Sequence, residues 1–132
     1  MGMYLLVALG GAIGSTGRYF MSGVMARLIG ETFPWGTLFV NVTGSFIIGF
    51  FAALTGPDGR FYVGSGGRQF VMTGICGGYT TFSSFSLQTL NLINDGEWVR
   101  AGANMGISLM LCLLAVWAGF IAANMINTIK WT

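Results

Sequence analysis

The sequence predicts an all-α integral membrane protein that crosses the bilayer with four helices. Of its 132 residues, 54% are hydrophobic and only 8% are charged, and the mean hydropathy is +0.72. Soluble domains carry about 25% charged residues, and a soluble domain this short could not bury so much apolar surface. The uncharged stretches are also continuous and too long for the alternating strands of a membrane barrel.

Four stretches lack charged residues, namely 1–17, 32–57, 69–94 and 101–129. A hydrocarbon core about 30 Å thick needs about 20 helical residues, so each stretch can hold one span. We expect helices near Tyr4–Leu28 (interrupted by Arg18), Gly36–Thr55, Gln69–Ile93 and Val99–Asn127. The short connections predict one four-helix transmembrane domain over residues 1–132. Because the N-terminus lacks a basic segment and a small-residue cleavage site, we interpret it as the first span.

The basic residues outside the spans leave the orientation open. On one side of the predicted bundle lie Arg60, Arg68 and Lys130, and on the other lie Arg27 and Arg100. Three against two is a very weak bias under the positive-inside rule. Either the chain inserts in both orientations, so that two copies can pair antiparallel, or one orientation wins narrowly.

The acidic residues exclude several functions. All four fall in predicted loops: Glu31, Asp58, Asp95 and Glu97. A proton-coupled exporter usually needs a carboxylate at membrane depth, which counts against the alternative reading, a small four-helix multidrug-type exporter. The sequence has no histidine and both cysteines fall in predicted spans, so a transition-metal site is not expected. We expect neither an enzyme nor a nucleic-acid partner.

Neutral polar residues recur at intervals of four on two predicted spans. They are Thr37, Asn41 and Ser45 on the second, and Asn104, Ser108 and Cys112 on the fourth. Such residues share one helix face. They either join helices by hydrogen bonds, at about 0.6 kcal/mol each, or line a narrow polar path.

The first span carries three glycines and an arginine. The spacing of Gly10, Gly14 and Gly17 is typical of close helix packing. Arg18 either faces protein or water and marks a site, where it raises the local positive potential, or extends to the membrane interface.

The segment GGYTTFSSFS at residues 77–86 predicts a break in the third span. Each glycine costs a helix interior about 1 kcal/mol relative to alanine, so Gly77 and Gly78, with the threonines after them, are expected to break it. Freed carbonyls are tolerated only inside protein or beside a cavity, where they suit a hard cation such as Na⁺. Phe82 and Phe85 share a face after the break. Their rings either present positive edges to a small anion or pack in the core.

Three segments carry a family resemblance: GGAIGSTGR in the first span, WGTLFVN at 35–41, and GGYTTFSSFS. Over essentially its whole length the chain resembles the Fluc fluoride channels, also called CrcB proteins. The resemblance implies a passive, fluoride-selective channel that lets cytoplasmic fluoride leave across the bacterial inner membrane. It also implies an antiparallel, dual-topology homodimer with two separate pores.

The resemblance also implies roles for individual residues. Phe82 and Phe85 would line the pores, and the other expected anion-site residues are Asn41, Ser108, Thr37, Ser84 and Arg18. Backbone carbonyls of Gly77 and Thr80 from both subunits would hold a structural Na⁺ at the dimer interface. The chain departs from the usual family pattern with Ser84 for threonine, Gln88 for glutamate and Tyr79 for an aliphatic residue.

Overall fold

The computed structural model describes residues 1–129, and every regular element in that range is helical. Lys130 lies outside the described residues. In chain order the elements are α1 (Gly2–Ile29), α2 (Trp35–Leu54), α3 (Ser65–Arg68), a π-helical segment η1 (Gln69–Cys76), α4 (Gly77–Tyr79), α5 (Phe82–Asn94) and α6 (Trp98–Thr128). The all-helical prediction is therefore confirmed for this range.

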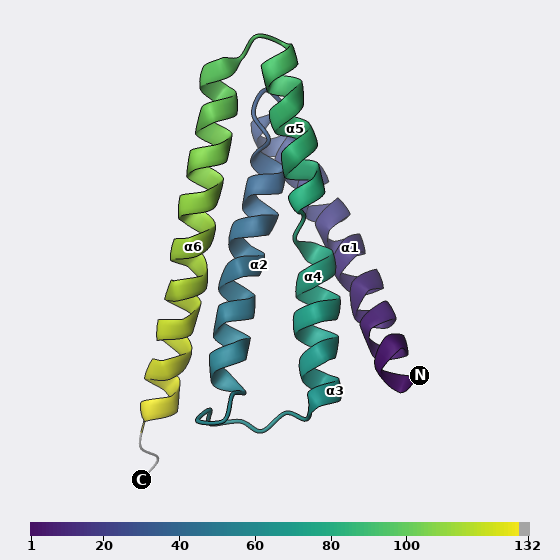
Figure 1. Ribbon diagram of the computed structural model, residues 1–132, viewed down its shortest axis with the longest axis vertical. Coiled ribbons are helices and arrows are strands. Elements are labelled where there is room, and N and C mark those ends of the chain that lie inside the picture. Colours follow the sequence, from purple (N-terminus) through teal and green to yellow (C-terminus); the bar gives the residue numbers. More distant parts are fainter. Residues whose placement is uncertain (130–132) are drawn as a thin grey trace.

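The helices run alternately up and down. In Figure 1, α2 and α6 lie side by side, the α3-to-α5 stretch forms a third line, and α1 crosses behind at an angle. The ends of α1 and α6 nearest the chain termini lie at the same end of the bundle as the α2–α3 loop. Among the described residues, α2 and α6 are long and apolar enough to cross a membrane. The other two predicted spans contain an arginine or an interruption, and their assignment stays a prediction.

The observed helix ends differ from the expected ones by a few residues. The first helix starts at Gly2 and stops before Gly30, whose φ of 101° favours glycine. The third stretch starts at Ser65 rather than at Gln69. Arg68 explains the earlier start, because its side chain donates to the Thr55 hydroxyl at the end of α2. This hydrogen bond connects α3 to α2.

Glycines allow the helices to approach closely. A Cβ added to Gly10 would lie 2.9 Å from the Gly74 Cα, and one added to Gly74 would lie 2.9 Å from the Gly10 Cα. At Gly14 it would lie 2.8 Å from the Tyr79 nitrogen. The predicted packing role is confirmed for Gly10 and Gly14. At Gly17 the nearest atom is a Tyr79 ring carbon at 3.8 Å, an ordinary contact that does not require glycine.

Few side chains are fully buried in the single chain. The buried hydrophobic residues in the described range are Leu38, Val40, Cys76, Ala101 and Ala123. Large apolar side chains instead cover the outer surface, especially along α6, where Leu109, Leu113 and Trp117 are about 60% exposed. This distribution suits a protein whose surroundings are lipid or another apolar chain.

Candidate functional site at a helix interruption

The helical path through residues 65–94 is interrupted at Thr80 and Thr81. Thr80 has φ −86° and ψ 158°, and Thr81 has φ −151° and ψ 119°, so both are extended. The interruption therefore falls on the two threonines of the predicted segment and not on its glycines, since α4 contains both glycines and Gly77 has helical angles of −64° and −38°. Gly78 instead allows close packing, because a Cβ there would lie 2.7 Å from the Gly11 carbonyl oxygen of α1.

Asn41 holds the interruption from α2. Its Nδ2 donates to the Thr81 carbonyl at 3.0 Å, and its Oδ1 accepts from the Thr81 N–H at 2.7 Å. One amide therefore satisfies both backbone groups of the residue that leaves the helix, as apolar surroundings require. In a continuous helix the Thr81 N–H would bond the carbonyl four residues earlier. That acceptor, the Gly77 carbonyl, loses this donor.

Arg18 satisfies a second carbonyl at the interruption. Its Nε donates to the Gly78 carbonyl at 3.0 Å, and the side chain is half-buried. In a continuous helix the Gly78 carbonyl would accept from the N–H of Phe82, four residues later. Because a new helix, α5, begins at Phe82, this carbonyl faces the gap between the two helices. This contact favours the reading in which Arg18 faces protein at a site.

Beside the interruption lies a cavity of about 350 Å³, which we call the interruption cavity. It brings together six of the nine predicted site residues, namely Asn41, Gly77, Thr80, Phe82, Phe85 and Ser108. The two phenylalanine rings are 5.4 Å apart between centroids and tilted by 47°. Phe82 is 78% exposed in the single chain, so this cavity is open on one side.

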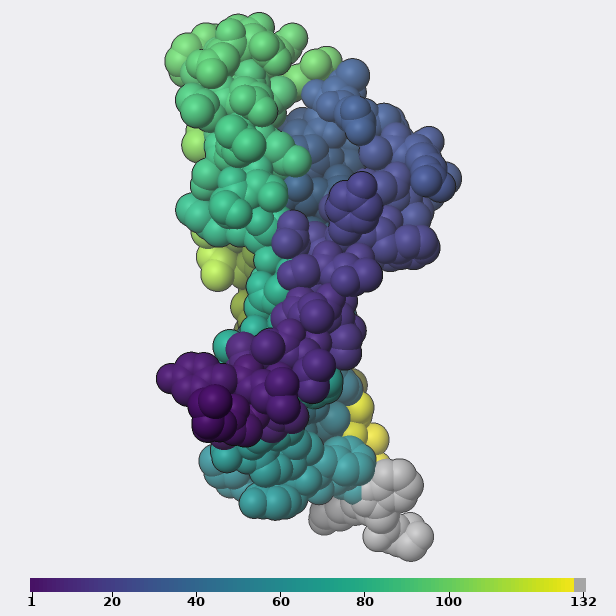
Figure 2. All heavy atoms as spheres, turned by 90° about the vertical axis from the view of Figure 1, so that its right-hand side faces the viewer, coloured from purple at the N-terminus to yellow at the C-terminus, as the bar shows by residue number. Residues whose placement is uncertain are grey.

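The other three predicted residues, Arg18, Thr37 and Ser84, line a larger hollow of about 670 Å³, which we call the vestibule. The second half of α1, the α1–α2 loop, α5 and the start of α6 form its walls. Figure 2 shows it between the green spheres of α5 and the blue spheres that follow α1. Thr81 lines both cavities, so the interruption held by Asn41 separates them.

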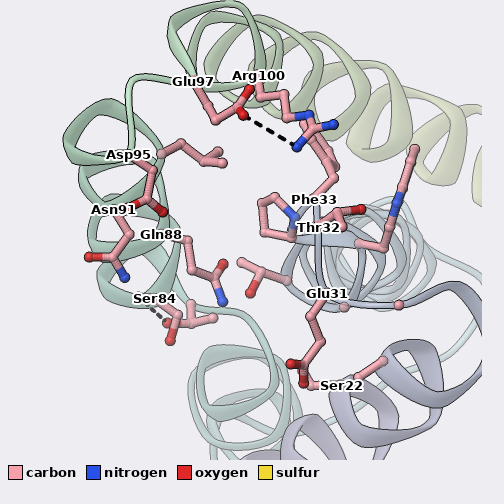
Figure 3. A pocket seen from close by; sticks show the side chains of 18 of the residues that line it. Ser22, Glu31, Thr32, Phe33, Ser84, Gln88, Asn91, Asp95, Glu97 and Arg100 are labelled. Atoms are coloured by element: carbon pink, nitrogen blue, oxygen red, sulfur yellow. Dashed lines mark hydrogen bonds and ion pairs between the residues drawn. The ribbon is translucent and has the colours of Figure 1, made fainter.

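Five charged residues line the vestibule, namely Arg18, Glu31, Asp95, Glu97 and Arg100. Glu97 and Arg100, both about half exposed, form an ion pair at 3.8 Å near the start of α6 (Figure 3). Deeper in the vestibule, Gln88 points inward from α5 (Figure 3), and its Oε1 is buried without a hydrogen-bond donor from residues 1–129. The deeper wall thus offers neutral amide and hydroxyl groups together with Arg18.

The fourth-span polar face has two roles. Ser108 lines the interruption cavity, and its Oγ donates to Asn104 Oδ1 at 3.2 Å. Asn104 is 1% exposed, and its Nδ2 donates to the Thr89 hydroxyl of α5 at 2.9 Å. Helix joining and cavity lining therefore coexist. The spacing in the sequence identified Asn104 and Ser108 as one face, but no local pattern linked Thr89 to them.

Tyr79 adds a contact that its sequence position did not suggest. Its hydroxyl lies 2.9 Å from the Thr43 hydroxyl of α2, and its ring packs against Gly44. The residue therefore connects the last turn before the interruption to α2.

The helices are apolar, the acidic residues lie in loops or at helix ends, and the interruption cavity is lined by aromatic and neutral polar groups. These features define a small all-helical membrane protein with an uncharged site beside an interrupted helix. The chain belongs to the CrcB family: residues 5–120 match the family described as CrcB-like protein, Camphor Resistance (CrcB).

Relatives cover almost the whole chain. A protein of Opitutus terrae is 66% identical over 130 residues, 98% of both chains. One of Rhodospirillum rubrum is 57% identical over 94% of this chain and 96% of its own, and one of Methylocella silvestris is 55% identical over 96% and 97%. All three carry the name fluoride-specific ion channel FluC.

Proposed function

We propose that the protein is a fluoride-selective ion channel that lets cytoplasmic fluoride leave the cell passively. The carrying observation is the 66% identity, over 98% of both chains, to a protein named for that activity. The interruption cavity supports the same function, because it joins two aromatic rings to the amide of Asn41 and the hydroxyl of Ser108. A channel conducts without chemical conversion, in line with the expectation that the chain is no enzyme.

The chemistry of fluoride explains what such a site must do. Hydrogen fluoride enters a cell as a neutral acid and dissociates inside, which traps the anion. A pore must replace the strongly held water of fluoride, yet bind weakly enough to release it. Ring edges, hydroxyls and amide N–H groups carry partial positive charge and meet both demands, whereas an arginine in the narrow part would hold the anion too long. Arg18 instead lines the vestibule, where it raises the local positive potential without binding the anion in the narrow part.

The interruption also suits a structural Na⁺. The Gly77 carbonyl lacks the Thr81 donor, and Thr80, whose ψ is 158°, turns its carbonyl away from the helical direction. Both residues line the interruption cavity. In this proposal their carbonyls, together with those of a second copy, hold Na⁺ on a two-fold axis. A bound cation supplies the positive charge that these oxygens lack in apolar surroundings.

The assembly that we propose is an antiparallel homodimer with two pores in the bacterial inner membrane. Four spans per chain fit the up-and-down course of the helices in Figure 1, with the interrupted α3-to-α5 stretch as the third span. The exposed Phe82 and the open cavity favour a second copy as the missing wall. A very weak charge bias permits insertion in both orientations, and lipid covers the remaining apolar surface.

The test is anion release from liposomes that contain the purified protein. Fluoride should leave far faster than chloride, and its release should need no proton gradient. The exporter reading requires proton coupling through a membrane carboxylate, but all four acids lie at or beyond helix ends, at Glu31, Asp58, Asp95 and Glu97. Equal chloride release, or fluoride accumulation driven by protons, would contradict the proposed function.

A further inference from the structure

A buried chain of hydrogen bonds connects α6 to α5 next to the interruption cavity. Ser108 donates to Asn104 Oδ1 at 3.2 Å, Asn104 Nδ2 donates to the Thr89 hydroxyl at 2.9 Å, and Thr89 donates to the Phe85 carbonyl at 2.8 Å. Thr89 and Ser108 are each 7% exposed and Asn104 is 1% exposed. We call these three side chains the relay. Each hydrogen bond of the relay is donated in the same direction, from Ser108 at the cavity towards α5.

In this arrangement the Ser108 hydroxyl cannot donate a hydrogen bond to an anion. A serine hydroxyl has one proton and two lone pairs, and the proton is engaged by Asn104. The groups that Ser108 presents to the interruption cavity are then lone pairs, which repel an anion. If Ser108 simply turned its proton into the cavity, the buried Asn104 oxygen would be left without a donor, which is costly in a dry interior.

We propose that Asn104 is a positioning residue whose amide reverses the relay, and thereby turns the Ser108 hydroxyl proton towards fluoride. Rotating the amide by half a turn exchanges its oxygen and nitrogen without changing its shape. Thr89 then donates to Asn104 Oδ1, Asn104 Nδ2 donates to Ser108 Oγ, and Ser108 donates into the cavity. No bond to hydrogen breaks, because each hydroxyl keeps its own proton and only rotates.

In the reversed relay each group that was bonded in the resting relay still has a hydrogen-bond partner. The Phe85 carbonyl gives up the Thr89 hydroxyl, but it keeps the helical bond from the backbone N–H four residues on. The 3.2 Å bond from Ser108 to Asn104 is the longest of the three, and it is the one that an arriving anion must replace. Only a side chain with both a donor and an acceptor at position 104 can serve both states.

The inference rests on the proposed function, and it is tested by fluoride release from liposomes. Asn104→Leu removes the reversible amide and leaves the Ser108 proton to the backbone carbonyl one turn earlier. Ser108→Ala removes the donor itself. Each should slow release about tenfold, the cost of one buried hydrogen bond, and the double variant should also be slowed about tenfold rather than a hundredfold. Independent structural roles would instead multiply the two losses.

Thr89 gives a second pair of variants with nearly unchanged shape. Thr89→Ser keeps the hydroxyl and should release fluoride within about twofold of the original protein, whereas Thr89→Val should be slowed about tenfold. Asn124→Leu is the matched control for the substitution at 104, since Asn124 lies on the same helix and its one side-chain hydrogen bond within residues 1–129 is a 3.5 Å bond to Asn127. It should release fluoride normally. The elution volume in size-exclusion chromatography checks that each variant keeps its assembly.

The outcomes separate the two claims. If the unaltered protein releases no fluoride, the proposed function fails and the relay falls with it. If it releases fluoride but Thr89→Val matches Thr89→Ser, or the Asn104 and Ser108 losses multiply, the relay alone is overturned.

Discussion

At the scale of single residues, the Asn41 side chain can combine a structural role with the role predicted for it in the anion path. Asn41 was predicted as part of an anion path, and the structure shows its amide bonded to both backbone groups of Thr81. The Asn41 Nδ2 carries two hydrogen atoms. One of them is donated to the Thr81 carbonyl, which leaves the second free to donate elsewhere. Asn41 can therefore hold the backbone and still offer one donor to the interruption cavity that it lines.

Asn41→Asp tests this double role. The carboxylate keeps the shape of the amide but loses both donors, so that the Thr81 carbonyl is left without its partner and an ionised side chain repels anions. Fluoride release should fall at least a hundredfold, since the free-energy costs of one added negative charge and one lost hydrogen bond add. Release rates in liposomes, normalised to protein of native elution volume, measure it. Unchanged fluoride release would show that the Asn41 amide neither holds the Thr81 backbone for function nor donates to the anion.

The two rings test the anion path directly. Phe82→Ile and Phe85→Ile keep an apolar side chain but remove the positive ring edge. If the rings line the path, each change should slow fluoride release by about tenfold or more, as loss of one favourable contact predicts. Phe46→Ile is the control, because its ring stacks on Phe50 outside both cavities. Normal release in both test variants would assign Phe82 and Phe85 to packing.

At the scale of helices, glycine contacts bring α1 close to the stretch that precedes the interruption. Backbone atoms of Gly10 and Gly74 are so close that neither position has room for a side chain. Gly78 meets the Gly11 carbonyl in the same way. In membranes such small residues permit tight van der Waals packing, and here this packing places Arg18 within reach of the Gly78 carbonyl.

Gly74→Ala should therefore destabilise the protein. Its Cβ would lie 2.9 Å from the Gly10 Cα, a backbone atom that cannot swing away, and overpacking of this kind costs about 1–3 kcal/mol. The temperature at which half of the native elution peak is lost on heating should fall. Gly102→Ala on α6 is the control, because no atom lies within 4 Å of its added Cβ. A Gly74→Ala protein as heat-resistant as the control would contradict the packing argument.

At the scale of the whole molecule, the proposed homodimer would complete the site of each chain. The interruption cavity is open beside the exposed Phe82, and Gly77 is exposed as well. A two-fold axis at this surface would bring equivalent carbonyls together. The same axis would close the interruption cavity against lipid, so that its polar groups would not face hydrocarbon.

This assembly predicts a dependence on Na⁺ and on mixed orientation. Fluoride release should be lost slowly after exchange of Na⁺ for a bulky organic cation, because an ion held between two chains leaves only when they loosen. A tag at the C-terminus should be reachable from both sides of the membrane, since each dimer contains both orientations. Labelling from one side alone, or full activity after exhaustive Na⁺ removal, would contradict the arrangement.

The class of the protein could be predicted from the sequence alone. Composition, uncharged runs and the position of every acid depend on residue type and local order, and these suffice to indicate apolar helices and to exclude membrane carboxylates. The helix–helix glycine contacts were also foreseeable, because their spacing is a local helical property. Local propensity misplaced the interruption, however, since a glycine pair that weakens a helix can instead serve close packing.

Only the tertiary structure decided how the site is built. The interruption falls at Thr80 and Thr81 because Asn41, 40 residues away in sequence, offers the Thr81 backbone a better partner than the helix does. The relay likewise depends on Asn104 and Thr89, on different helices. Spacing along a chain specifies which residues share a face, but not which faces meet. Hydrogen bonds between helices, made where no water can replace them, settle that second question.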